Sequence, residues 1–290
     1  MRIASLLPAS TEIVCALGLR ERLVGVSHEC DFPVEVKSLP RLTGAHVDSS
    51  KGSAAIHEQV GGRLSSGLSL YEVLEDELAR VKPDLIITQD TCDICAVAQS
   101  DVEAAVANIV GRETRILSLA PKTLDDVFAN ISSVGEATNS KTAAQTLTEN
   151  LKKRLRTLKK ECAERAPMTV LFLEWLDPPM VGGHWTPTLT ETAGGIPILG
   201  HKNQPTRAVT WQEIRESDPD CIAVAPCGFP TAQTERELPA LLEGPLSSMR
   251  ATQEGRVFVI DGNAYFNRPG PRLVDSAETL ARILTSCANS

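Results

Sequence analysis

The sequence predicts an α/β protein of two lobes with parallel sheets, joined by one long backbone helix. In both halves of the chain, short apolar runs alternate with helix-like segments, as in parallel strands connected by crossover helices. Between the halves, residues 124–166 contain no strand signal. The expected domains are an N-terminal lobe (1–123), a helix linker (124–166) and a C-terminal lobe (167–290).

The N-terminal lobe begins with a strand and a well-marked helix. Ser10 or Thr11 is the candidate N-cap of a helix over residues 10–19, after Pro8, and Gly18 ends it. The Ser- and Gly-rich stretch 48–67 predicts a loop or a short helix. The strand-like runs of this lobe are residues 2–7, 23–27, 84–88 and 115–119, and residues 69–81 form its second marked helix.

The linker carries an amphipathic pattern. Leucines recur every three or four residues from Leu147 to Leu158 and the pattern continues to Cys162, with Lys and Arg between, which predicts one long helix ended by Pro167. The C-terminal lobe has strand-like runs at 169–175, 221–225 and 256–261, and a last helix at 273–284.

The two lobes resemble each other. Residues 77–92 and 213–228 each contain a helix, a Pro-Asp pair, an apolar strand and a cysteine-bearing turn. Two such Rossmann-like lobes would leave a cleft between them. Ligands of open α/β sheets bind outside the carboxyl ends of the strands, so the residues after each strand are the first candidates for a site.

Composition excludes several classes of partner. The chain has 290 residues with 29 basic and 37 acidic side chains, and the net charge of −8 argues against nucleic-acid binding. Its apolar runs are too short for a membrane helix, and the N-terminus does not resemble a signal peptide. As the sequence stands we expect a cytoplasmic protein, or a periplasmic or extracellular one if a leader was removed.

Catalysis finds little support in the motifs. The sequence has no GxSxG, HExxH, phosphate-loop or GxGxxG signature, which argues against the common hydrolytic and nucleotide chemistries. Glu29 and Glu174 would form an acid/base pair only if they faced each other. We therefore expect a binding protein rather than an enzyme.

Two cysteine-bearing turns follow strands of the first lobe. His28 and Cys30 stand in HEC, and Cys92 and Cys95 form a CxxC pair, so these four residues are the candidate metal ligands, for zinc or iron. A redox couple and plain packing under a turn are the alternatives. The metal interpretation leads to the second functional hypothesis, a zinc or iron binding protein or a metal-dependent enzyme.

The opening residues 2–27, the helix and strand at 77–87, the long middle helix and the segment 177–199 resemble the class III periplasmic binding proteins. In that family a rigid helix joins two α/β lobes, and members carry cobalamin, ferric siderophores, haem or metal ions. The resemblance is strongest to the cobalamin-binding branch. It implies a cleft for a metal-centred chelate, most closely cobalamin or another corrinoid, used for uptake through an ABC importer membrane component or for intracellular delivery.

The resemblance also selects site residues. It points to the loop with Asp177, Pro178, Met180 and Gly183 and to the late segment 262–272. Trp175 and Trp185 are candidate stacking faces, although a Trp beside a strand end is as often a core residue, and a loop His is often a surface residue. The candidate chelate contacts are His28, Glu29, Glu174, Trp175, His184, Trp185, Tyr265, Phe266 and Arg268.

Two features depart from the family pattern. The family docks on its transporter through an acidic residue on each lobe; Glu75, Asp76 or Glu77 fits in the first lobe, but Gln212, beside Glu213, stands at the matching place in the second. The HEC and CxxC turns resemble a leaderless branch of the family.

Overall fold

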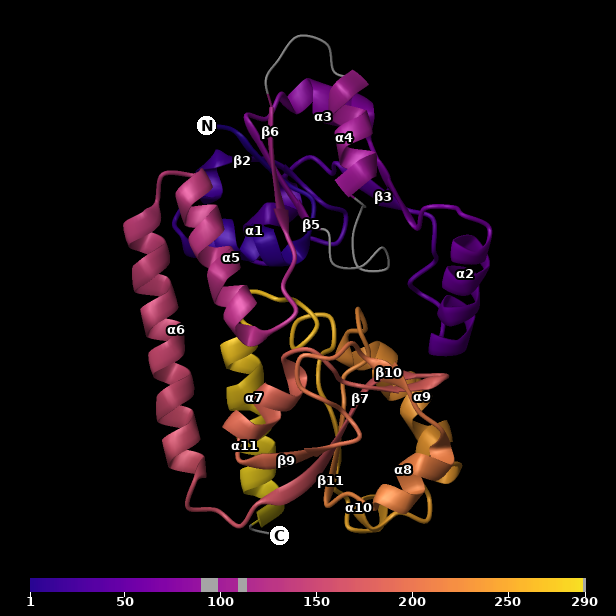
Figure 1. Cartoon of the computed structure of the whole chain (residues 1–290). Coiled ribbons are helices and arrows are strands. Elements are labelled where there is room, and N and C mark those ends of the chain that lie inside the picture. The colour runs from indigo at the N-terminus through magenta and orange to yellow at the C-terminus, as the bar shows by residue number, and fades with distance from the viewer. Residues whose placement is uncertain (90–98, 109–113, 289–290) are drawn as a thin grey trace. The chain divides into compact units, whose positions relative to one another are not determined.

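The structure, a computed structural model, describes residues 1–89, 99–108 and 114–288 (Figure 1). The chain divides into two compact units. Unit 1 comprises residues 1–48, 58–121 and 125–149, and unit 2 comprises residues 49–57, 122–124 and 150–290. Within the described ranges, no helix is long and apolar enough to cross a membrane.

Unit 1 is built on a four-stranded parallel sheet in the order β2-β1-β5-β6, beside a two-stranded antiparallel sheet of β3 and β4. Its central strand β5 is buried along its whole length, which explains why it is a continuous apolar run. The strands are β1 (Ile3–Ser5), β2 (Leu23–Val26), β3 (Thr43–Ala45), β4 (Tyr71–Val73), β5 (Leu85–Gln89) and β6 (Arg115–Leu119). The α-helices that begin in this part of the chain are α1 (Pro8–Ala16), α2 (Ser53–Ser65), α3 (Glu75–Val81), α4 (Gln99–Asn108), α5 (Leu124–Ala137) and α6 (Lys141–Cys162).

The start of α1 differs from the prediction. The helix begins at Pro8 with Leu7 as its N-cap, and no side chain caps it. Pro suits the first helical position because its missing N–H would have no partner there. Ser10 and Thr11 lie inside the helix and are fully buried, so the prediction that either one caps it is wrong.

Of the two predictions for the stretch 48–67, a loop or a short helix, the structure has a helix, α2, of 13 residues. Its N-terminal end is held by helix α9 (Thr231–Glu243) of unit 2. The Glu237 carboxylate accepts bonds from the amide and the hydroxyl of Ser53, at 2.9 and 2.5 Å. The Gln233 amide donates to the carbonyls of Ser49 and Lys51, at 3.0 and 2.8 Å. These contacts join segments that are distant in sequence. They help to stabilise the start of α2, which explains why a helix forms although its local sequence pattern is weak.

The leucine pattern from Leu147 to Cys162 lies in one long helix, α6, as predicted, and a separate helix, α5, precedes it in the linker. Asn139 takes a left-handed conformation with φ of 57° and ends α5, and α6 starts two residues later. The helices approach closely where a Cβ added to Gly135 would lie 2.4 Å from that of Ala144. Both helices are amphipathic, so the apolar periodicity continues across the break. Residues 141–149 of α6 belong to unit 1 and residues 150–162 to unit 2.

Unit 2 contains a mixed sheet in the order β10-β8-β7-β11-β12, in which β9 also pairs with β7. On one edge of β7, the parallel β9 pairs with its first half and the antiparallel β8 with its second half. The strands are β7 (Met168–Leu176), β8 (Pro179–Val181), β9 (Gly195–Ile198), β10 (Arg207–Ala208), β11 (Cys221–Val224) and β12 (Val257–Val259). The remaining helices are α7 (Thr186–Thr192), α8 (Trp211–Ser217), α10 (Arg250–Gln253) and α11 (Leu273–Ala288).

Helices cover both faces of this sheet (Figure 1). Leu171 and Leu173 of β7 and Ile222 and Val224 of β11 join a core cluster that includes Ile214 of α8. Alternate residues of the same strands point to the opposite face, toward α7 and α11. The carboxyl ends of β7 and β11 therefore emerge from a sheet that is packed on both sides.

Helix α8 offers a direct test of local stability. Thr210 and Glu213 form a capping box: the Glu213 amide donates to the Thr210 hydroxyl at 3.1 Å, and the Thr210 amide donates to the Glu213 carboxylate at 2.7 Å. We expect Thr210→Ala to lower the free energy of unfolding by about 1 kcal/mol, with Thr210→Ser restoring most of it. Urea unfolding followed by circular dichroism measures both, and equal stability of Thr210→Ala and the wild type would contradict this role.

Candidate functional site

A buried hydroxyl network lies at the carboxyl end of β1. The Ser5 and Ser10 hydroxyls are 2.5 Å apart, and the Thr11 hydroxyl donates to that of Ser5 at 2.7 Å. The Thr11 oxygen also lies 3.1 Å from the Cys30 sulfur, so Cys30, which is buried, is held against the start of α1. This network positions the turn that follows β2.

His28 stands on that turn and is half-buried. Its Nδ1 lies 2.8 Å from the Thr43 hydroxyl, and its ring lies against Tyr71 with centroids 5.6 Å apart. Burial lowers the pKa of His28, and the positive charge of Arg41 lowers it further. A neutral imidazole is the form that binds a metal ion. Its Nε2 is 4.0 Å from the carboxylate of Glu29.

The predicted metal set is only partly described. Cys92 and Cys95 lie outside the described residues, so their distance to His28 and Cys30 is not defined. Among the residues that are described, no group of three His, Cys, Asp or Glu side chains is placed to hold a metal ion. The four-residue metal site stays a prediction.

In unit 2, the carboxyl group of Glu174 lies near the end of β7. Burial raises its pKa to about 7, although the Thr206 hydroxyl and the Gly183 amide both donate to the carboxylate and oppose the shift. The Thr206 bond is 2.7 Å long. Glu174 therefore exchanges a proton near neutral pH. A titrating carboxyl group beside a strand end is a feature of functional sites.

The loop after β8 brings His184 beside this carboxyl group. His184 has a left-handed backbone with φ of 50°, and its amide donates to the Gln204 carbonyl at 2.6 Å. The imidazole stacks on Trp185 with centroids 5.5 Å apart. Burial lowers its pKa, and its buried Nδ1 has no hydrogen-bond partner among the residues that the structure describes.

Two aromatic rings of unit 2 remain partly exposed at the predicted site. Trp175 lies next to Glu174 at the end of β7, its indole N–H donates to the Asp177 carbonyl at 3.1 Å, and its edge meets the ring of Phe229. Tyr265 is partly exposed too, and the Arg272 guanidinium lies 5.8 Å from its ring centre. Both rings are therefore held in fixed positions by their neighbours.

Three other side chains predicted to contact the chelate are buried. Trp185 is buried and donates its indole N–H to the Phe266 carbonyl at 2.6 Å, and Phe266, 1% exposed, packs on Phe172. Arg268 is 6% exposed and donates to the Asn263 side chain at 2.7 Å. These side chains hold the late segment against the sheet, which explains their position without a ligand. The prediction that Trp185, Phe266 and Arg268 contact the chelate stays a prediction.

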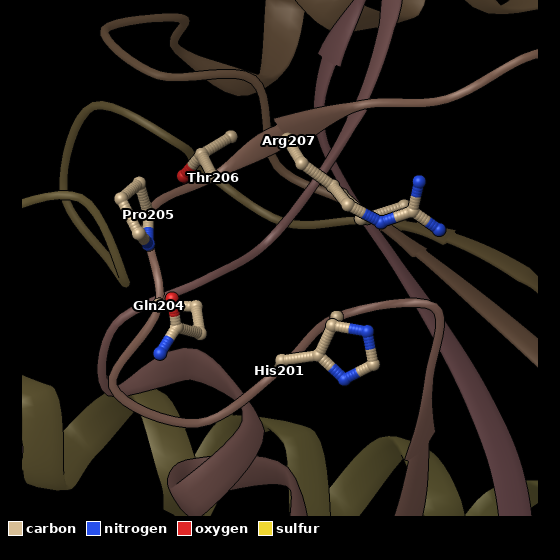
Figure 2. Close-up of a pocket in the computed structure, with 7 residues that line it drawn as sticks. His201, Gln204, Pro205, Thr206 and Arg207 are labelled. Carbon is tan, nitrogen blue, oxygen red and sulfur yellow. The ribbon is translucent and has the colours of Figure 1, made fainter.

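A cavity of about 340 Å³ is lined by residues of the loop between β9 and β10, among them Thr206, and by Val181 at the end of β8. Figure 2 shows the side chains of His201, Gln204, Pro205, Thr206 and Arg207 around it. Arg207 donates to the Leu199 carbonyl and pairs with Glu213 at 3.3 Å. His201, one of the residues that line this cavity, is exposed.

The fold defines a class: an α/β protein of two units with parallel strands, in which ligands are expected outside the carboxyl ends of the strands. The chain belongs to the periplasmic binding protein family, whose model matches residues 3–264. This confirms the resemblance drawn from the sequence, and the two α/β units with parallel strands confirm the predicted fold class.

Individual relatives cover almost the whole chain. The vitamin B12-binding protein of Vibrio cholerae is 24% identical over 286 residues, which span 98% of this chain and 88% of that protein. An uncharacterized ABC transporter substrate-binding lipoprotein of Bacillus subtilis is 22% identical and covers 97% of this chain and 78% of its own length.

Solved structures share the fold. The periplasmic vitamin B12-binding protein of Vibrio cholerae aligns with a TM-score of 0.68 at 22% identity, covering 100% of this chain and 98% of that one. A periplasmic haem-binding protein from Roseiflexus aligns with a TM-score of 0.73 at 20% identity, covering 99% of each chain. One fold therefore carries different chelates, so the ligand of this chain must be argued from its own residues.

Proposed function

We propose that this protein binds a metal-centred chelate, a corrinoid such as cobalamin, and presents it to the membrane component of an ABC importer. Membership of the periplasmic binding protein family supports a small-molecule ligand. The name of the Vibrio cholerae relative, which matches 98% of the chain, supports the corrinoid.

The observation that carries the proposal is that a partly exposed indole, Trp175, and a carboxyl group of raised pKa, Glu174, follow each other at the end of β7. A partly exposed indole offers a flat apolar face that suits a large planar ligand. The neighbouring carboxyl group, with its pKa of about 7, accepts a hydrogen bond when ionised and donates one when protonated. Corrinoids carry peripheral amides that use both kinds of bond, so the pair fits such a ligand.

A titration separates this ligand from its rivals. The protein is purified without chelators, its metal content is measured, and hydroxocobalamin and haemin are each added while the visible spectrum and the heat of binding are recorded. Saturable binding of cobalamin by metal-free protein supports the proposal. Binding of haemin alone would overturn the corrinoid and keep the chelate. Stoichiometric zinc or iron without a response to either chelate would overturn both, in favour of the HEC and CxxC metal hypothesis.

Trp175→Ala is expected to weaken cobalamin binding by about tenfold or more, because a buried aromatic contact contributes on the order of 1–3 kcal/mol to binding. Trp175→Phe keeps a flat ring and is expected to retain most of the affinity. Ile196→Ala, which shortens an exposed side chain of β9 in the same unit, is the matched control and should bind normally. Isothermal titration calorimetry gives the three dissociation constants, and wild-type affinity in folded Trp175→Ala would remove this residue from the site.

A further inference from the structure

Two thiols meet in the interior of unit 2, between β11 and α11. Cys221 is the first residue of β11 and Cys287 lies in the last turn of α11. Both are buried, at 0% and 3% exposure, and each thiol is close enough to the other to influence its pKa. None of the described cysteines forms a disulfide. Neither thiol belongs to the proposed ligand site.

The packing of strand and helix explains why they meet. Ile222 and Val224 join the core on the α8 side of the sheet, so Cys221 and Ala223 point to the α11 side. Cys221 stands opposite Val170 in the parallel pairing of β11 with β7. Val170 and Leu284 of α11 both approach Gly195, where an added Cβ would lie 2.8 and 3.1 Å from them.

The helix spacing completes the argument. Cys287 follows Leu284 by three residues, so both side chains lie on the face of α11 that covers the sheet. The position of Cys287 is therefore set by helix periodicity, and that of Cys221 by strand register. Together they place both thiols between β11 and α11.

We propose that Cys221 and Cys287 form a disulfide bond that ties the C-terminal helix to β11 when the protein meets a disulfide oxidant such as oxidised glutathione. One protein thiolate attacks a sulfur of the oxidant, which releases one glutathione thiol and leaves a mixed disulfide. The second protein thiolate attacks the protein sulfur of that bond and releases the second glutathione. The protein loses two hydrogens and two electrons, and one oxidised glutathione becomes two reduced molecules.

Burial of the two thiols slows this reaction in the folded protein. Loss of hydration raises the pKa of both thiols, so few thiolates form in the folded state and oxidation is slow there. Fraying of the last turn of α11, or folding in the presence of oxidant, gives access. The bond closes a long loop of chain, from 221 to 287, and restricts the unfolded state.

The test uses the full chain. The protein is unfolded, refolded in a buffer of reduced and oxidised glutathione, alkylated and digested, and the peptides are compared with and without reduction by mass spectrometry. A cross-linked pair of peptides containing Cys221 and Cys287 supports the proposal. Full alkylation of both residues, or pairing of either with another cysteine, overturns it.

Two variants make the measurement specific. Cys92→Ser/Cys95→Ser removes the CxxC pair as another source of disulfide signal. This variant should keep the 221–287 link. In thermal melts, the oxidised protein should unfold about 5 °C or more above the reduced one, and Cys287→Ser should abolish this difference. An equal redox-dependent shift in Cys287→Ser would assign the stabilisation to other cysteines and overturn the link as its cause.

Discussion

Gly183→Ala is expected to lower the free energy of unfolding by about 3 kcal/mol, since an added methyl group has no space there. The new Cβ would lie 2.4 Å from the Gln204 carbonyl oxygen, 2.5 Å from the Pro205 carbonyl carbon and 2.6 Å from the Thr206 amide nitrogen. All three are backbone atoms, so relief of the clash must displace the whole loop. That loop carries the Thr206 hydroxyl bonded to Glu174.

The effect should therefore reach the site as well. Movement of the 204–206 segment breaks the bond between Thr206 and Glu174 and widens the neighbouring cavity, so we expect weaker binding of cobalamin in the same variant. Gly61→Ala is the matched control because nothing lies within 4 Å of its added Cβ in helix α2. It should gain about 0.5–1 kcal/mol from higher helix propensity. Urea unfolding of the two variants measures the contrast, and equal stability would refute the close packing at Gly183.

The second large effect concerns Glu174 and pH. The pKa of Glu174 is raised from an ordinary value of 4.5 to about 7, so the folded protein holds this proton more tightly than the unfolded chain. Stability contributed by this group is therefore highest at low pH, falls as the pH rises above about 4.5, and is fully lost above about 7. The shift corresponds to roughly 3 kcal/mol at most.

Glu174→Gln mimics the protonated acid and cannot ionise. The difference in stability between this variant and the wild type is therefore expected to move in favour of the variant by about 2–3 kcal/mol between pH 5 and pH 8. Comparing the two proteins at each pH cancels the titration of all other groups. Parallel pH profiles would show that Glu174 ionises as an ordinary surface carboxyl group.

Thr206→Val provides an internal check on the cause. It removes the hydroxyl that donates to the carboxylate, so burial is opposed by one bond fewer and the pKa should rise further. The pH at which Thr206→Val stops losing stability relative to Thr206→Val/Glu174→Gln should then lie higher than in the pair without the Thr206 change. A shift to lower pH would contradict the hydrogen bond.

Much of the fold was predictable because its signals are local. The central residues of three apolar runs, 85–88, 170–173 and 221–224, are buried, which makes the runs continuous and easy to identify. The Pro-Asp pairs that precede two of them mark the same helix-to-strand turn in both units. Parallel pairing followed from the alternation of strands with helices, and the structure confirms it.

Other features could not be predicted because they depend on contacts between segments that are distant in sequence. The apolar periodicity does not reveal the break at Asn139, because the helices on both sides of it, α5 and α6, are amphipathic. Helix α2 is held by Glu237 and Gln233, which lie far along the chain. Sequence left open whether Trp185 is a stacking ring or a core residue, and in the structure it is buried with its indole N–H bonded to the backbone of the late segment.

The sequence by itself determined the class of this protein: its order of strands and helices, its family and the strand ends that carry the candidate residues. These depend on short-range patterns, namely apolar periodicity, Pro and Gly at turns, and charge. Only the tertiary structure decided which of those residues are exposed, that the pKa of Glu174 lies near neutrality, and that Cys221 meets Cys287. Exposure, desolvation and contact are set by segments distant in sequence, so no local pattern encodes them.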